Sequence, residues 1–295
     1  MHRWWTASRA AAAIVADRPA LWLPGALAWV VGIGWLALVI GVARAPNTAG
    51  LTFLGAGIFA SGAWPWNAVA IGVGALLVTL AAMALAAAAE AALLRGRRAT
   101  AVGVRRLFVL GVICAAPVAA ALLLTATVAV MVARAEFNAP GETMDPVART
   151  ALGVAPLLLV TIVAAVAGGA VHAAAVRHAV EGAPIEASFR RGLRDLRVAG
   201  RRAVAHASAL LIIRVAYLAI AAVLLRVLWA PIGERLKLAG LTSADALLLV
   251  GFVAIWLCLV LAGGALHAWG SSTWSRVLAV PDPATEPTAQ RSASR

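Results

Sequence analysis

The sequence predicts an all-α, multi-pass integral membrane protein, and three observations support that prediction. First, 63% of the 295 residues are hydrophobic and 13% are charged, whereas soluble domains are roughly 45–50% apolar and about 25% charged. Second, six apolar runs each approach the roughly 20 residues that a helix needs to cross a bilayer. Third, basic residues gather in every second connection between the runs. We expect one membrane domain over residues 1–280 and a disordered cytoplasmic tail over residues 281–295.

The elements follow in chain order. Residues 2–18 contain tryptophans, alanines and arginines, which predicts an interfacial helix that ends before Pro19. The first apolar run is longer than the roughly 7–15-residue core of a signal peptide, which favours an uncleaved span. Residues 49–63 are short, apolar and glycine-rich, and we expect an interfacial or re-entrant piece there. The six predicted spans cover residues 20–42, 66–90, 107–133, 152–175, 207–229 and 246–269.

Arginine placement predicts the orientation of the chain. With the N-terminus inside, the inner segments hold 18 basic residues and the outer loops hold 5, while Arg214 and Arg226 lie within span five. We therefore expect a bacterial cytoplasmic (inner) membrane protein with both termini in the cytoplasm. The net charge of +13 comes mainly from short loops between spans, so membrane lipids with anionic headgroups are the expected partner and nucleic acid is not.

Residues 184–205, between spans four and five, predict an amphipathic helix in the inner headgroup layer. Ile185, Phe189, Leu193 and Leu196 recur at helical spacing and make one apolar stripe. Much of the remaining surface is arginine, and each basic residue near anionic lipid contributes about 1 kcal/mol. The expected headgroup-binding residues are Arg190, Arg191, Arg194, Arg197, Arg201 and Arg202.

A repeated motif organises the chain into three units. Ala-Gly-Gly-Ala-Val-His-Ala at residues 167–173 returns as Ala-Gly-Gly-Ala-Leu-His-Ala at 262–268, and an alanine-rich echo carries Glu90 at the equivalent position. The spans then form three hairpins of one orientation, which are parallel repeats about an axis along the membrane normal. Threefold packing would bring Glu90, His172 and His267 to one depth near the inner surface. The glycine pairs 168–169 and 263–264 would let helices approach closely.

These residues, with Arg214, form a candidate polar cluster. A carboxylate with two imidazoles suits zinc or non-haem iron, which makes Glu90, His172 and His267 candidate metal ligands. The spacing contains no chelating His-x-x-x-His pair, however, and each residue can instead mark where its helix leaves the hydrocarbon. We assign no metal and no other cofactor.

Arg214 lies near the middle of span five, where an arginine costs about 2.5–3.5 kcal/mol on insertion scales. We predict that it pairs with Glu90, directly or through water. The alternatives are a bond to a backbone carbonyl or an extended side chain that reaches the inner surface.

Catalytic signatures such as His-Glu-x-x-His, Gly-x-Ser-x-Gly or a Walker-type phosphate loop do not occur in the sequence. The two cysteines, Cys114 and Cys258, lie in apolar runs, where we expect them to pack as small hydrophobic residues. We therefore predict no catalytic residue and no enzymatic activity; a metal-dependent membrane enzyme is the remaining enzymatic hypothesis.

The layout resembles uncharacterised bacterial six-span proteins related to the membrane domain of glycerophosphodiester phosphodiesterases. The resemblance lies in the basic N-terminal stretch, the Pro24-Gly25 entry to span one, and Gly182-Ala183-Pro184 leading to Ser188-Phe189-Arg190-Arg191. It implies a membrane-embedded accessory role, and it transfers no catalytic residue because the soluble enzyme domain is not in this sequence.

Two functional hypotheses follow from the sequence. The first is a non-enzymatic membrane scaffold or accessory subunit that binds anionic headgroups through its arginine-rich inner helices and has a protein partner in the membrane. The second is a permease or transporter component with a polar cavity around Arg214, Glu90, His172 and His267. A water-accessible cavity reaching the membrane midplane would favour the second.

Overall fold

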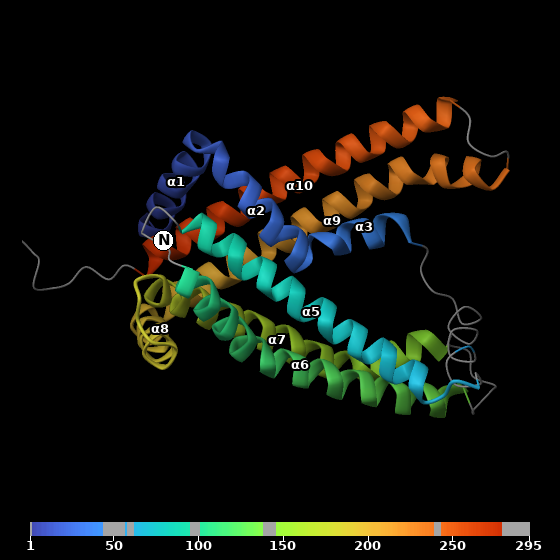
Figure 1. Ribbon diagram of the computed structural model, residues 1–295, viewed down its shortest axis with the longest axis horizontal. Helices are drawn as coiled ribbons and strands as arrows, with labels where there is room; N and C mark the ends of the chain where they lie inside the picture. Colours follow the sequence, from blue (N-terminus) through green and yellow to red (C-terminus); the bar gives the residue numbers. More distant parts are fainter. Residues whose placement is uncertain are drawn as a thin grey trace, which may run out of the picture.

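The computed structural model describes residues 2–43, 57, 62–94, 101–137, 146–238 and 243–278. Regular structure within these ranges is entirely helical, which confirms the predicted all-α fold (Figure 1). The predictions for the 281–295 tail and for most of residues 49–63 fall outside the described residues. The elements are α1 (His2–Asp17), η1 (Pro19–Leu21), α2 (Trp22–Trp29), η2 (Val30–Gly34), α3 (Trp35–Val42), α5 (Trp66–Leu93), α6 (Ala101–Phe137), α7 (Pro146–Val180), α8 (Ile185–Ala199), α9 (Arg201–Leu238) and α10 (Ser243–Val277).

Six helical stretches are long and apolar enough to cross a membrane, as predicted. Each contains the corresponding predicted run and extends beyond it at one or both ends. Large apolar side chains are widely exposed on them; Val78, Leu123 and Leu247 are 70%, 70% and 74% exposed. Lipid is the solvent that suits such a surface. The stretches are Pro19–Val42, Trp66–Leu93, Gly103–Ala133, Ala148–Val180, Arg201–Leu236 and Ser243–Val277.

Span one is assembled from several short pieces. A 3₁₀ turn (η1) leads into α2, and a π-helical segment (η2) joins α2 to α3. The ring of Trp29, which is 2% exposed, lies against Gly34 and Gly263. A Cβ at either glycine would overlap that ring, so the two glycines create the space for the tryptophan. A π segment inside a helix is uncommon, and periodicity does not reveal it.

The spans pack unequally. Helices α6 and α7 lie side by side as one hairpin, and α9 and α10 form another. Span one contacts α9 and α10 more extensively than it contacts α5, so its main partners are not its neighbour in sequence. A rotational relation among the three pairs stays a prediction. In Figure 1, α1, α8 and the end of α10 lie at one end of the bundle, which we call the α8 end.

Glycine contacts explain the close packing at the α8 end of α10. A Cβ at Gly264 would overlap the backbone of α2 at Ala26, and one at Gly168 would approach the carbonyl of Cys114 within 2.6 Å. The predicted close approach therefore exists at these positions, but Gly169 differs, since a Cβ there would meet nothing within 4 Å. Cys114 is buried as expected, whereas Cys258 is exposed on its span.

The predicted helix over 184–205 is shorter than expected. Gly200 has a φ of 47°, in the left-handed region that glycine adopts easily, and it separates α8 from α9. Its N–H bonds to the carbonyl of Leu196 at 2.8 Å and closes the last turn of α8. The predicted helix end at residue 205 was therefore wrong, because Arg201 and Arg202 lie in the first turn of α9. Their binding to headgroups stays a prediction. Figure 1 shows α8 nearly end-on, so α8 runs across the end of the bundle.

Candidate functional site

Glu90, in the last turn of α5, is the centre of the polar cluster. Its side chain is 18% exposed, and Oε2 lies 3.2 Å from Nε2 of His267, whose side chain is 21% exposed. The hydroxyl of Ser271 donates to Oε1 at 2.5 Å. His267 and Ser271 are one turn apart on α10, so they present both partners on one face. A carboxylate taken out of water needs such partners.

His172 and Arg214 complete the cluster without bonding directly to Glu90. The charge of Glu90 acts on both the imidazole of His172 and the guanidinium of Arg214. Nδ1 of His172 is buried and has no hydrogen-bond partner. Arg214 reaches past Gly270, where a Cβ would lie 3.5 Å from Nη2. The direct partners of Glu90 are His267 and Ser271, and the pairing of Arg214 with Glu90 stays a prediction.

Sequence reasoning missed two members of this region. Ser271 follows the apolar run of span six and carries no pattern of its own; only its position four residues after His267 could have indicated it. His206 is fully buried in the first turns of α9. Its ring packs edge-on against Trp274 with centroids 4.6 Å apart and planes at 78°.

The candidate metal ligands do not form a metal centre. In the part of the chain that the structure describes, no three His, Cys, Asp or Glu side chains are grouped so that they could hold a metal ion. Glu90, His172 and His267 are all described, and only Glu90 and His267 are in direct contact. The geometry therefore gives the metal hypothesis no support.

Helix α8 docks on α7 through small side chains. Ser188, Gly192 and Ala199 are buried, and a Cβ at Gly192 would come within 2.8 Å of the backbone nitrogen of Ala175. Nε2 of His178 on α7 lies 2.8 Å from Oδ2 of Asp195 on α8. The docking fixes which face of α8 points away from the bundle.

That outward face carries the arginines. Arg190, Arg191, Arg194 and Arg197 are exposed, and Arg190 pairs with Glu186 one turn earlier at 2.6 Å. Arg201 and Arg202 are also exposed, at the start of α9. The predicted stripe lies on the opposite side, where Ile185 and Phe189 pack on the core beside α6 and α7 and Leu196 packs on the core that contains Trp274.

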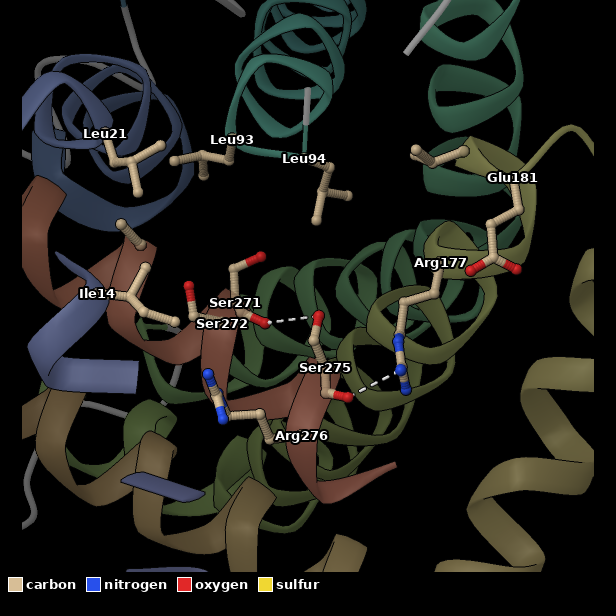
Figure 2. Close-up of a pocket in the computed structure, with 12 residues that line it drawn as sticks. Ile14, Leu21, Leu93, Leu94, Arg177, Glu181, Ser271, Ser272, Ser275 and Arg276 are labelled. Atoms are coloured by element: carbon tan, nitrogen blue, oxygen red, sulfur yellow. Dashed lines mark hydrogen bonds between the residues drawn. The ribbon is translucent and has the colours of Figure 1, made fainter. Parts of the chain in front are cut away.

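A cavity of about 390 Å³ opens at the α8 end between α1, α5, α7 and α10 (Figure 2). We call it the serine pocket, because Ser271, Ser272 and Ser275 of α10 lie along one side with Arg276 and with Arg177 of α7. Nη2 of Arg177 donates to the carbonyl of Ser275 at 2.7 Å. Ser271 connects the pocket to Glu90. The remaining lining comprises Ile14, Leu21, Leu93, Leu94, Val180, Glu181 and Ala268.

The fold and this polar end define an all-α protein with the helices of a six-span, multi-pass membrane protein. No family model, curated protein or solved structure matches the chain. The functional argument therefore depends on the geometry of the chain itself.

Proposed function

We propose that the protein is a non-enzymatic scaffold or accessory subunit of the bacterial cytoplasmic membrane, with both termini cytoplasmic, that binds anionic lipid headgroups through α8. One observation supports this most directly. Helix α8 lies across the end of the spans (Figure 1), with one face docked on α7 and with Arg190, Arg191, Arg194 and Arg197 exposed on the other. A helix of this kind presents its charges to the headgroup layer of one leaflet.

The exposed arginines of α8 carry enough charge to attract anionic lipid. Each basic residue at an anionic membrane contributes about 1 kcal/mol, so Arg191, Arg194 and Arg197 together supply about 3 kcal/mol. The exposed pair of Arg190 with Glu186 is worth only about 0.3–0.5 kcal/mol, so Arg190 remains available to a phosphate. A soluble phosphodiester backbone could satisfy the same charges, but the spans on both sides of α8 hold it against lipid.

The test uses the full chain in nanodiscs made from equal amounts of phosphatidylglycerol and phosphatidylcholine. Mass spectrometry of the lipid that remains bound after mild detergent extraction measures the enrichment of phosphatidylglycerol. We expect enrichment that falls with added salt and that falls in the variant Arg191→Gln/Arg194→Gln/Arg197→Gln. The exposed positions of these three arginines leave the fold intact.

Glu186→Gln is the matched control, because it removes a charge of opposite sign from the same helix. It should raise the enrichment slightly by releasing Arg190. Equal enrichment in the triple variant and the unaltered protein would contradict the proposal. Thiol labelling of a cysteine placed at Ala187 or Val198 from only the outer side of intact cells would contradict the orientation.

A permease or transporter component is the second candidate, and the polar cluster favours it. Charged groups within a span face the bundle interior or a water-filled path when they serve transport, and Ser271 joins Glu90 to the serine pocket. In a variant without native cysteines, Ser271→Cys should react with a membrane-impermeant thiol reagent only from the α8 side if the bundle is closed. Reaction from both sides would favour transport over the accessory role.

A further inference from the structure

We propose that the serine pocket is a saturable binding site for the phosphate group of an amphiphile, such as a phospholipid, at the α8 end. The proposal deepens the proposed function and rests on its placement of the α8 end in the cytoplasmic leaflet. It adds one defined site, formed by α1, α5, α7 and α10, to the diffuse arginine surface of α8. The volume of about 390 Å³ lies within the roughly 300–1,000 Å³ of typical ligand sites.

The polar side of the pocket offers donors suited to phosphate. Figure 2 shows the guanidinium groups of Arg177 and Arg276 on either side of Ser275, with Ser272 on the same side of Ser275 as Arg276. Hydrogen bonds from arginine to phosphate oxygens are charge-assisted and geometrically specific. Ser271 already donates its hydroxyl hydrogen to Glu90, so Ser272 is the serine placed to donate to a ligand.

The opposite side of the pocket is apolar and suits a hydrocarbon chain. Leu21 lies in the first turn of span one, Leu93 is the last residue of span two, and Leu94 follows it. The pocket is therefore at the edge of the hydrocarbon region, the depth at which a lipid carries its phosphate. A free inorganic phosphate would gain nothing from these leucines, whereas an amphiphile would bury apolar surface against them, at about 25 cal/mol per Å².

Negative charge also faces the pocket, so a bound phosphate needs a cation whose charge is not already offset. Helices α5, α7 and α10 all end here, and each carboxyl-terminal end carries a partial charge of about −0.5. Glu181, which follows the last residue of α7, lines the pocket as well. Arg177 bonds to the Ser275 carbonyl and so offsets part of this negative charge. Arg276 is exposed and makes no ion pair with any described residue, so it contributes most of the charge available to a ligand.

The test measures binding to the full chain in detergent micelles by native mass spectrometry. The probes are dioctanoyl phosphatidic acid, dioctanoylglycerol, which has the chains without phosphate, and inorganic phosphate. We expect phosphatidic acid to saturate at one molecule per chain and dioctanoylglycerol to bind far less. Arg276→Gln should weaken binding at least about tenfold, because it removes a charge-assisted bond. Ser272→Leu, which fills the pocket, should do the same.

The matched control is Arg105→Gln, which removes an exposed arginine of α6 at the same end of the molecule, outside both the pocket and the α8 surface. It should leave the binding of phosphatidic acid unchanged. Unaltered binding in Arg276→Gln and Ser272→Leu, or displacement of the lipid by equimolar inorganic phosphate, would overturn the proposal. If Arg276 serves only to offset the partial negative charge at the carboxyl-terminal end of α10, its replacement will lower thermal stability without weakening lipid binding. That result would also overturn the proposal.

The two lipid proposals fail in different ways. Loss of phosphatidylglycerol enrichment in the α8 triple variant, with stoichiometric binding of phosphatidic acid retained, supports both. Unchanged enrichment in that variant contradicts only the proposal for α8. Binding of phosphatidic acid that depends on Arg105 as strongly as on Arg276 contradicts only the proposal for the pocket.

Discussion

Replacing Glu90 with glutamine is the most direct test of the polar cluster. The substitution keeps the shape of the side chain and one acceptor oxygen, but it removes the charge that faces His267, Ser271, His172 and Arg214. Hydrogen bonds to a charged group contribute about 1.5–3 kcal/mol, and those between neutral groups contribute about 0.5–1.5 kcal/mol. Weakening two direct bonds from the first range to the second lowers the free energy of unfolding by about 2–3 kcal/mol.

An opposing effect reduces this loss. A carboxylate that is 18% exposed has lost most of its hydration, and glutamine loses less on burial. The carboxylate nevertheless has two direct partners and a nearby guanidinium, so we expect the loss of hydrogen-bond energy to exceed the gain from easier burial. The net decrease in the free energy of unfolding is then about 2 kcal/mol. The assay is unfolding by sodium dodecyl sulfate in mixed micelles, followed by far-ultraviolet circular dichroism.

Ser271→Ala provides the comparison, because it removes a single bond to the same carboxylate and should cost about 1.5–3 kcal/mol. The double variant should cost less than the sum of the two, since both changes act on one bond. If Glu90→Gln unfolds within about 0.5 kcal/mol of the unaltered protein, the contact of Glu90 with His267 and Ser271 does not stabilise the bundle and the cluster has been misjudged.

Three further predictions concern packing. Gly264→Ala should lower the melting temperature strongly, because its Cβ would overlap the backbone of α2. Gly169→Ala is the control: nothing lies within 4 Å of its new Cβ, so it should be neutral or stabilise the protein by up to about 1 kcal/mol. Similar shifts in melting temperature for both variants would refute the packing of α10 on α2. Gly192→Val should detach α8 from α7 and speed amide exchange over residues 185–199, and unchanged exchange would contradict the docking. Tyr217→Phe removes the bond from its hydroxyl to the Leu259 carbonyl at 2.6 Å and should cost about 0.5–1.5 kcal/mol in the same unfolding assay.

The spans were predictable because length and apolar composition alone define them. Each predicted run is contained in a helical stretch that the structure describes, since a segment of roughly 20 apolar residues has few alternatives to helical structure in lipid. The ends were less predictable, because the helices continue into the polar layer. Glu90, for example, was placed at the end of span two, and α5 continues to Leu93. Gly200 is a residue type that often ends a helix, but the arginine-rich sequence on both sides of it favoured one continuous helix.

The candidate site was predictable in part. The repeated motif identified Glu90, His172 and His267, and the structure brings Glu90 and His267 into contact. What the sequence could not supply was the partner set, because Ser271 and His206 have no distinctive spacing. The contact of His178 with Asp195 was equally hidden, since it depends on how α8 folds back on α7. The pairing of Arg214 with Glu90 stays a prediction, and the direct bonds of Glu90 go to His267 and Ser271.

The recurring motif in span six has a physical explanation in the position of α10. Lipid provides no hydrophobic force between helices, so small residues and polar bonds must specify their packing. Helix α10 contacts α1, α2, α7 and α9 and bonds through His267 and Ser271 to α5. Gly263 and Gly264 allow span one to pack closely against α10. The next turns of the same helix carry His267 and Ser271, the partners of Glu90. The equivalent stretch of α7 uses Gly168 against α6 but places His172 without a direct partner for Nδ1. The motif thus gives close helix contact in both α7 and α10. Its histidine bonds to a partner side chain in α10, through His267 and Glu90. Substitutions in α10 should therefore disturb the bundle most.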